Sequence, residues 1–218
     1  MRQRLLSAVF GAAFATLPAA TMIAQAPESQ SLVSAVRFGK PALVRSLLER
    51  GADANARVDE PASGNVVSVA FTAMNGMALM NRLDEPDPAK HAAALDVLRA
   101  LIEKKPDLDL AFRMGPRTAT PLMLAAEAGA LDVVRVLIDG GANPNATNGG
   151  RYTALDFVAD RPPGWSTFPP ADRVEIAKLL LAKGARTDRA GADGVKPAER
   201  ARRAGFTEIA ALIEGSKR

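Results

Sequence analysis

Residues 120–146 carry the clearest pattern of apolar and polar positions in the chain. The apolar side chains of their second half recur every three or four residues, the spacing of one helix face, and are Val133, Val134, Val136, Leu137 and Ile138. Before them, Ala125 and Ala126 are small enough to let a first helix lie close to its neighbours. Gly129 stands between the two segments and permits a tight turn. The pattern therefore predicts two antiparallel helices joined at Gly129.

Both ends of this unit carry residues that start and stop helices. Pro121 costs no hydrogen bond at a first helical position, and Thr120 before it can cap the helix. Gly141 is suited to end the second helix in a left-handed conformation, and Asn143 and Asn145 suit an extended turn. We therefore expect a helix, a turn, a second helix and a projecting hairpin.

The same unit recurs along the chain. Related segments occupy residues 31–56, 92–110, 152–188 and 194–214. In the second of these, Lys105 and Pro106 take the places of the Gly-Ala pair that follows the outer helix elsewhere. A helix pair has two apolar sides, so stacking the pairs buries a continuous core. The sequence thus indicates about five stacked repeats.

Residues 120–146, TPLMLAAEAGALDVVRVLIDGGANPNA, resemble the ankyrin repeat over 27 positions, with Met123 where the family usually has His and Asn143 where it has Asp. The resemblance implies an all-α, right-handed α-solenoid with β-hairpin fingers. It also implies a protein–protein interaction module without catalysis, which binds a partner through its concave face and fingers. The repeats are expected at about 29–57, 63–112, 118–147, 150–190 and 193–216.

Two of the repeats are longer than the family's 33 residues. The outer helices close at four landmarks, Gly51, Lys105, Gly141 and Gly184. Successive landmarks lie 54, 36 and 43 residues apart. Residues 65–71, NVVSVAF, stand where the inner helix of the second repeat is due, so we expect it to begin there. The additional residues of these two repeats then fall at about 74–89 and 159–170, in the turns between inner and outer helices.

The two inserts differ in chemistry. The first holds Met74, Met77 and Met80 at a spacing that places them near one helix face; they either fill the core or form an adaptable apolar contact surface. The second is rich in Pro and holds Trp165 and Phe168. These aromatic residues either pack back onto the stack or anchor a partner.

The first 26 residues read as a secretory signal peptide that precedes a repeat domain at 27–218. Arg2 and Arg4 come before an uncharged stretch that continues to Ala26 and ends in small residues. Cleavage after Ala24 or after Ala26 fits the pattern, and an uncleaved membrane anchor is the alternative. We therefore expect an exported protein, periplasmic or secreted, that is not held in the membrane once the segment is removed.

Composition excludes several classes of site. The chain has no Cys, which excludes disulfides, thiolate metal sites and a Cys nucleophile, and its single His rules out a site built from several His. No nucleophile, phosphate-binding or dinucleotide motif is present. His91 is expected to be an exposed residue at a helix start. We expect no enzyme, cofactor or metal; an enzyme would depend on His91 and carboxylates such as Asp84, Asp87, Asp160 and Asp172.

Basic residues gather in the expected fingers. We propose partner-binding residues there and in the second insert: Arg113, Arg117, Arg151, Tyr152, Trp165 and Phe168. Such a basic stripe would attract an acidic protein, although solvated fingers that keep the array soluble are the alternative. The net charge of +4 is too mild to favour nucleic acid. We expect a monomer that serves as a binding module, or as an accessory or inhibitor of one exported enzyme or toxin.

The last repeat carries charged residues in place of apolar ones. They are Arg200, Arg202, Arg203, Glu208 and Glu214. Terminal repeats need a polar outer side, so we expect all five to face solvent.

Overall fold

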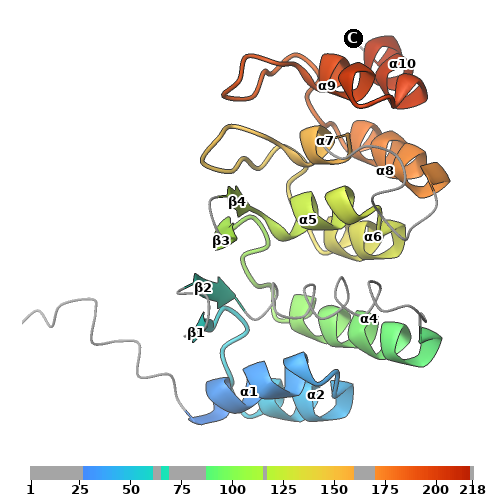
Figure 1. Cartoon of the computed structure of the whole chain (residues 1–218). Coiled ribbons are helices and arrows are strands. Elements are labelled where there is room, and N and C mark those ends of the chain that lie inside the picture. Colours follow the sequence, from blue (N-terminus) through green and yellow to red (C-terminus); the bar gives the residue numbers. More distant parts are fainter. Residues whose placement is uncertain (1–26, 61–64, 69–86, 115–116, 160–169, 217–218) are drawn as a thin grey trace, which may run out of the picture.

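A computed structural model describes residues 27–60, 65–68, 87–114, 117–159 and 170–216 (Figure 1). The helices in these ranges are α1 (Pro27–Arg37), α2 (Pro41–Glu49), α4 (Pro88–Ile102), α5 (Pro121–Ala128), α6 (Leu131–Asp139), α7 (Ala154–Phe157), α8 (Pro170–Ala182), α9 (Pro197–Arg203) and α10 (Thr207–Gly215). The strands are β1 (Arg57–Glu60), β2 (Asn65–Ser68), β3 (Phe112–Met114) and β4 (Arg117–Ala119).

Several predictions concern residues outside this description. The expected signal peptide at 1–26 is one of them. Most of both inserts, including the three Met residues, Trp165 and Phe168, lies at 69–86 and 160–169 and is likewise outside the described residues. Of the helices that are described, none combines the length and the apolar character that crossing a membrane requires.

The helices stack in two rows (Figure 1). In the outer row α2 packs against α4, α4 against α6, α6 against α8 and α8 against α10. In the inner row α5 packs against α7 and α7 against α9, and each inner helix also contacts its own outer helix. The fold is therefore an all-α repeat fold in which each helix pair buries its apolar sides against the pairs before and after it.

Four projections extend from one side of the stack, and we call them fingers (Figure 1). The first is the antiparallel hairpin β1–β2 and the second is the hairpin β3–β4, in which Arg113 lies opposite Thr118. Strand β2 lies beside β3, so these two fingers are neighbours. The third finger is the loop 146–153 and the fourth is the loop 189–195.

One predicted helix start is wrong. Residues 65–68 form strand β2, which pairs with β1 from Asn65 opposite Glu60 to Ser68 opposite Arg57. Val66 and Val67 are β-branched and favour a strand where a partner strand is available. The spacing of the repeats placed the segment in the right repeat. It carried no information about strand β1, which begins eight residues earlier and pairs with the segment.

Within the described residues, the structure agrees with the helix start expected at Thr120 and with the turns expected at Gly129 and after the outer helices. Thr120 caps α5 by accepting a hydrogen bond from the Met123 N–H at 3.3 Å, and Gly129 ends that helix with a φ of 79°. The outer helices are followed by Gly51, Gly141 and Gly184, with φ of 92°, 98° and 84°. Lys105 takes the same place after α4 and has a φ of 51°. The prediction that Lys105 replaces glycine is therefore confirmed, at the cost of a left-handed conformation that a side chain disfavours.

A ladder of hydrogen bonds joins the loops that follow the outer helices. Asn55 Oδ1 accepts from the Asp107 N–H at 2.7 Å, and Asp109 Oδ1 accepts from the Asn143 N–H at 2.8 Å. Asn145 Oδ1 then accepts from the Arg186 N–H at 2.8 Å. Each loop can be numbered from its left-handed residue, which counts as position one. The side chain at position five of one loop then accepts from the backbone N–H at position three of the next loop. The loops are thereby fixed relative to one another.

A buried arginine joins three repeats inside the stack. Arg173 of α8 is 3% exposed. Its guanidinium donates to the carbonyl oxygens of Glu127 and Val158, at 2.5 and 2.8 Å, and lies 5.5 Å from the centre of the Phe206 ring. The two carbonyls belong to the last turns of α5 and α7, where helices leave acceptors without intrahelical partners. Arg173 thus caps two inner helices and contacts Phe206 at the start of α10, in the last repeat.

Candidate functional site

Hydrogen bonds tie the second, third and fourth fingers into a row. The Asn148 side-chain amide donates to the Thr118 carbonyl at 2.8 Å, and the Gly149 N–H donates to Thr118 Oγ1 at 3.1 Å. The Ala192 N–H of the fourth finger donates to the Gly150 carbonyl at 2.9 Å. The row is held by backbone and short polar side chains, so it presents its longer side chains from fixed positions.

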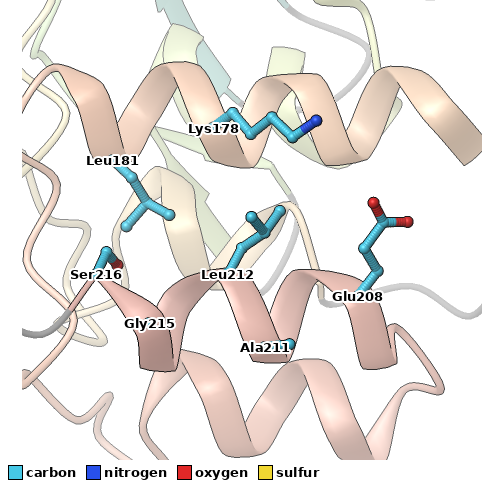
Figure 2. Close-up of a pocket in the computed structure, with 7 residues that line it drawn as sticks. All are labelled: Lys178, Leu181, Glu208, Ala211, Leu212, Gly215 and Ser216. Carbon is cyan, nitrogen blue, oxygen red and sulfur yellow. The ribbon is translucent and has the colours of Figure 1, made fainter.

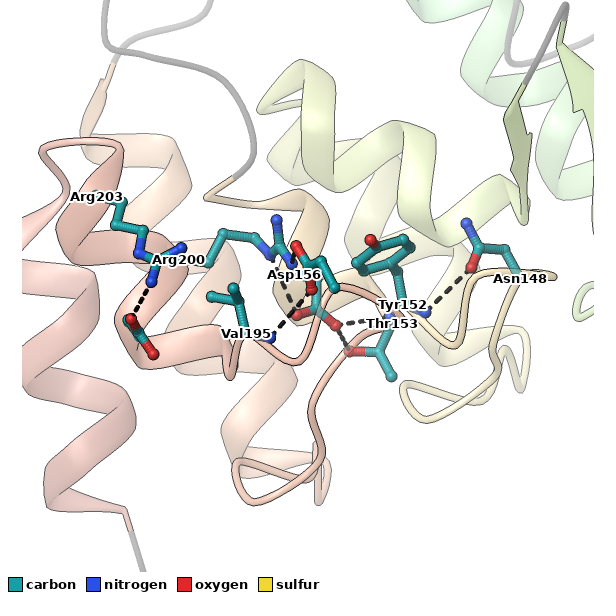
Figure 3. A network of polar contacts seen from close by, with 9 residues as sticks. Asn148, Tyr152, Thr153, Asp156, Val195, Arg200 and Arg203 are labelled. Carbon is teal, nitrogen blue, oxygen red and sulfur yellow. Dashed lines mark hydrogen bonds and ion pairs between the residues drawn. The ribbon is translucent and has the colours of Figure 1, made fainter.

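Tyr152 packs between the third and fourth fingers (Figure 3). A side chain at Gly150 or at Gly191 would overlap its ring, so both glycines leave room for the aromatic group. The ring also contacts the guanidinium of Arg200, whose central carbon lies 4.9 Å from the ring centre. The ring is half-buried as a result.

A buried carboxylate lies under this contact (Figure 3). Asp156 Oδ2 accepts from the Thr153 N–H at 2.8 Å and from the Thr153 hydroxyl at 3.0 Å, while Oδ1 lies 3.5 Å from Arg200 Nε. Burial raises the pKa of Asp156 above its ordinary value, although the Thr153 and Arg200 contacts oppose that shift. The carboxylate therefore joins α7 to α9, but burial destabilises its ionised form.

Asp193 lies on the other side of the same guanidinium. Its carboxylate accepts from Arg200 Nη2 at 2.7 Å and from the Val195 N–H at 3.1 Å. Partial burial acts to raise the pKa of Asp193, but these hydrogen bonds outweigh it, so the pKa lies below the ordinary value. Arg200 is thus shared between an ionised exposed carboxylate and a buried one.

The expectation that Arg200 faces solvent is wrong. Its side chain is only 15% exposed, because Tyr152, Asp156 and Asp193 surround its charged end. Arg202 and Arg203 are exposed as expected, and they form ion pairs with Glu214 and Glu199. The polar outer side of the last repeat is therefore made by these residues, while Arg200 joins it to the repeat before.

The predicted binding residues are spread over different environments. Arg113 on β3 and Arg151 in the third finger are exposed, and Arg151 has a φ of 61°. Arg117 lies on β4, opposite Met114. Tyr152 is adjacent to Arg151 but has its ring engaged between the fingers. Trp165 and Phe168 lie outside the described residues, so their proposed role stays a prediction.

His91 differs from its predicted setting. Its side chain is 25% exposed, and Nε2 contacts the carboxylate of Asp132 at the start of α6. The first turn of one outer helix is therefore joined to the first turn of the next. The sequence showed His91 at a helix start but gave no sign of the carboxylate 41 residues later that partly covers it.

The residues weighed for catalysis fall in different places. Asp87 caps α4 by accepting from the Ala89 and Lys90 N–H groups, and those bonds, together with the Lys90 side chain, lower its pKa. Asp172 lies in the first turn of α8, whereas Asp84 and Asp160 are outside the described residues. Within the described part of the chain, no group of three or more His, Cys, Asp or Glu residues could hold a metal ion.

A shallow groove of about 510 Å³ lies between the outer helices α8 and α10 (Figure 2). Leu181, Ala211 and Leu212 form its apolar lining, and Lys178 and Glu208 lie at one end. The Lys178 ammonium also donates to Glu175 at 2.8 Å, and this bond and the nearby carboxylates raise its pKa. The groove resembles an ordinary valley between two packed helices and carries no convergent polar groups.

Comparison with known proteins agrees with this architecture. Residues 113–158 match the family model described as ankyrin repeats (many copies), a segment that runs from the second finger through α7. The chain is also 31% identical over 120 residues to a protein of Ornithorhynchus anatinus, "Ankyrin repeat, SAM and basic leucine zipper domain-containing protein 1". That match covers 55% of this chain and 23% of the relative's length. The chain therefore contains ankyrin repeats, matched at residues 113–158, and its stacked helix pairs and joined fingers agree with that match.

Proposed function

We propose that this protein is a non-catalytic binding module that holds a protein partner against its concave face and fingers. Ankyrin repeats are generally protein–protein interaction modules. We propose further that five repeats make up the array, with the second containing α4 and each of the others containing one of the helix pairs. The identity of the partner is a separate matter, because one fold supports many partners.

The observation that carries this proposal is the row of joined fingers. Thr118, Asn148 and Gly150 link three successive fingers through hydrogen bonds of 2.8–3.1 Å. A backbone that is already held in this way loses little conformational freedom when a partner binds, which favours affinity. Arg113 and Arg151 are exposed on it. The fingers therefore offer two positive groups to a partner, on a backbone that hydrogen bonds hold in place.

Crosslinking followed by affinity capture from the exported fraction tests this function. We expect capture of a partner by the wild-type chain and its loss when Arg113, Arg117 and Arg151 are reversed to Glu. Arg135 of α6, which is exposed on the outer row, provides a control. Arg135→Glu makes the same change in charge as each finger substitution but lies away from the fingers. Capture that persists after reversal of the three finger arginines would reject the finger site.

We also propose that the protein is exported, on the strength of the charged start and uncharged run of residues 1–26. The exported form would begin at Gln25 or at Pro27, and it would act in the periplasm or outside the cell. Sequencing the N-terminus of the exported protein tests this. Soluble protein that keeps Met1 inside the cell would contradict it.

Within this function, a dedicated accessory or inhibitor role is a narrower version of the same proposal. A single exported enzyme or toxin would then be the partner. Capture at a fixed one-to-one ratio, with a change in the partner's activity on binding, would support the dedicated role. Capture of several unrelated proteins through the same arginines would support a general binding module.

A further inference from the structure

Two arginines project from neighbouring fingers without any partner among the described residues. Arg113 lies on β3 in the second finger, and Arg151 lies in the third. Both are exposed, and neither side chain forms a hydrogen bond or an ion pair within the described part of the chain. By contrast, Arg186 and Arg200, beside and behind the fourth finger, are both paired with Asp residues. Two positive groups are therefore available on adjacent fingers.

The backbone at Arg151 is held in a conformation that a side chain disfavours. Its φ is 61°, and Gly194 takes the corresponding place in the fourth finger with a φ of 74°, since each lies two residues before the cap of an inner helix. The Arg151 N–H donates to the Asn148 carbonyl at 3.0 Å, which fixes the turn. Strain of this kind concentrates at functional sites. Here no hydrogen bond, ion pair or ring contact of the Arg151 side chain with the described residues offsets it.

The distance between the two arginines follows from the way their fingers are joined. Arg113 lies opposite Thr118, and Thr118 in turn bonds Asn148 and Gly149. Arg113 and Thr118 lie on paired strands about 4.8 Å apart. The side chains of Thr118 and Asn148 then bridge to the third finger, a step at least as wide, so the backbones at Arg113 and Arg151 lie about 10–15 Å apart. Extended peptide rises about 3.1–3.4 Å per residue. Residues three or four apart in an extended segment span this distance.

We propose that Arg113 and Arg151 together bind an extended acidic segment of the partner, whose carboxylates lie three or four residues apart. Each guanidinium presents the planar donor pair that a carboxylate accepts. This inference rests on the function proposed above and specifies the chemistry of its partner. A nucleic acid fits less well, because the carboxylates of Asp188 and Asp193 flank the fourth finger and would repel its phosphates.

Two synthetic peptides of twelve residues and identical composition test the spacing. The first has Glu at every fourth position in a Ser/Gly background, and the second has its three Glu residues side by side. Binding to the full chain is measured by fluorescence anisotropy at low salt. We expect the spaced peptide to bind about fivefold more tightly, the upper range for one further exposed ion pair. Equal binding of the two peptides would overturn the inference.

Three variants show whether the preference comes from the named arginines. Arg113→Gln and Arg151→Gln should each remove the preference for the spaced peptide, whereas Arg135→Gln should keep it. Arg151→Gly relieves the left-handed strain, so it should raise the melting temperature and still lose the preference, which separates binding from folding. A preference lost equally in Arg135→Gln would mean general electrostatic attraction and would count against the site.

The remaining outcomes separate this inference from the function on which it rests. A captured partner that depends on Arg113 and Arg151, together with equal binding of the two peptides, would leave the binding module standing and reject the acidic spacing. A twelve-nucleotide single strand that binds more tightly than either peptide, through the same two arginines, would replace the acidic peptide with a nucleic acid. Partner capture that is unchanged when Arg113 and Arg151 are both replaced would reject the finger site itself.

Discussion

The guanidinium of Arg200 stacks on the ring of Tyr152, with its carbon 4.9 Å from the ring centre, and thereby fastens the last repeat to the one before it. Gly150 and Gly191 leave room for the ring in this position, because a Cβ at either glycine would overlap its atoms. A half-buried aromatic residue of the third finger and a cation of α9 thus join neighbouring repeats, as apolar side chains do between the stacked helices.

Replacing Gly191 with Ala should open this contact. The added methyl group would overlap the Tyr152 ring, and overpacking of this kind costs about 1–3 kcal/mol in the free energy of unfolding. Urea denaturation measures the loss. Gly215→Ala is the control, because a methyl group there meets nothing within 4 Å and the residue ends helix α10. A loss at Gly191 no greater than that of the control would show that the ring moves aside freely.

Arg173→Leu should destabilise the array far more than an exposed arginine change does. The substitution leaves the Glu127 and Val158 carbonyls without the guanidinium and removes the contact with Phe206. A buried carbonyl that is left without a donor costs about 1–3 kcal/mol, so the loss of both bonds should cost about 2 kcal/mol or more. Arg135→Leu, at an exposed position of α6, should cost under about 0.5 kcal/mol. Equal thermal stability of the two variants would refute the capping role of Arg173.

Lys105→Gly should stabilise the protein. The residue has a φ of 51°, and a glycine avoids the roughly 1 kcal/mol that a left-handed conformation costs a side chain. The reverse change, Gly184→Lys, should destabilise by a similar amount, because a Cβ there meets nothing within 4 Å and the cost is conformational. Chemical denaturation of both variants checks the pair. Destabilisation by Lys105→Gly would show that the Lys105 side chain contributes more than its strain costs.

These outcomes mark what the sequence could predict. Pro121, Thr120, Gly129 and Lys105 act within a few residues of themselves, so local rules placed the helices and turns correctly. Arg173, Arg200 and His91 were beyond such rules, because their partners lie in neighbouring repeats and a charged residue is ordinarily exposed. The strand at 65–68 was missed for the same reason, since its pairing with β1 competes with the helix expected from the repeat. The exposure of Arg113 and Arg151 agrees with the basic fingers, but the strain at Arg151 was visible only in the backbone.

Asp156 should make stability depend on pH. Its pKa in the folded protein is raised by burial, so the folded state holds the proton more tightly than the unfolded chain. The contribution of Asp156 is therefore greatest below its ordinary pKa of about 3.9, and it is lost as pH rises through the folded pKa. Asp156→Asn removes this loss. The variant should thus gain stability relative to the wild type between pH 4 and neutral pH.

Denaturation curves at several pH values measure that difference. The lowered pKa of Asp193 acts in the opposite direction, since its contribution is lost as pH falls, and Asp193→Asn is the matched control. A stability gap between Asp156→Asn and wild type that stays constant from pH 4 to pH 7 would show that the buried carboxylate is ionised in the folded state without penalty.

The ladder of loop hydrogen bonds limits where this chain can accept added residues. All three links join an Oδ1 acceptor to a backbone N–H, although the acceptors Asn55 and Asp109 are 54 residues apart and Asp109 and Asn145 only 36. Differences in repeat length must therefore be absorbed away from the ladder. A short tag inserted after Gly39, in the turn between α1 and α2, should be tolerated, whereas the same tag after Asn143 would displace a link. Among the described residues, the turn between α1 and α2 is therefore a place where the protein can be lengthened or labelled without disturbing the ladder.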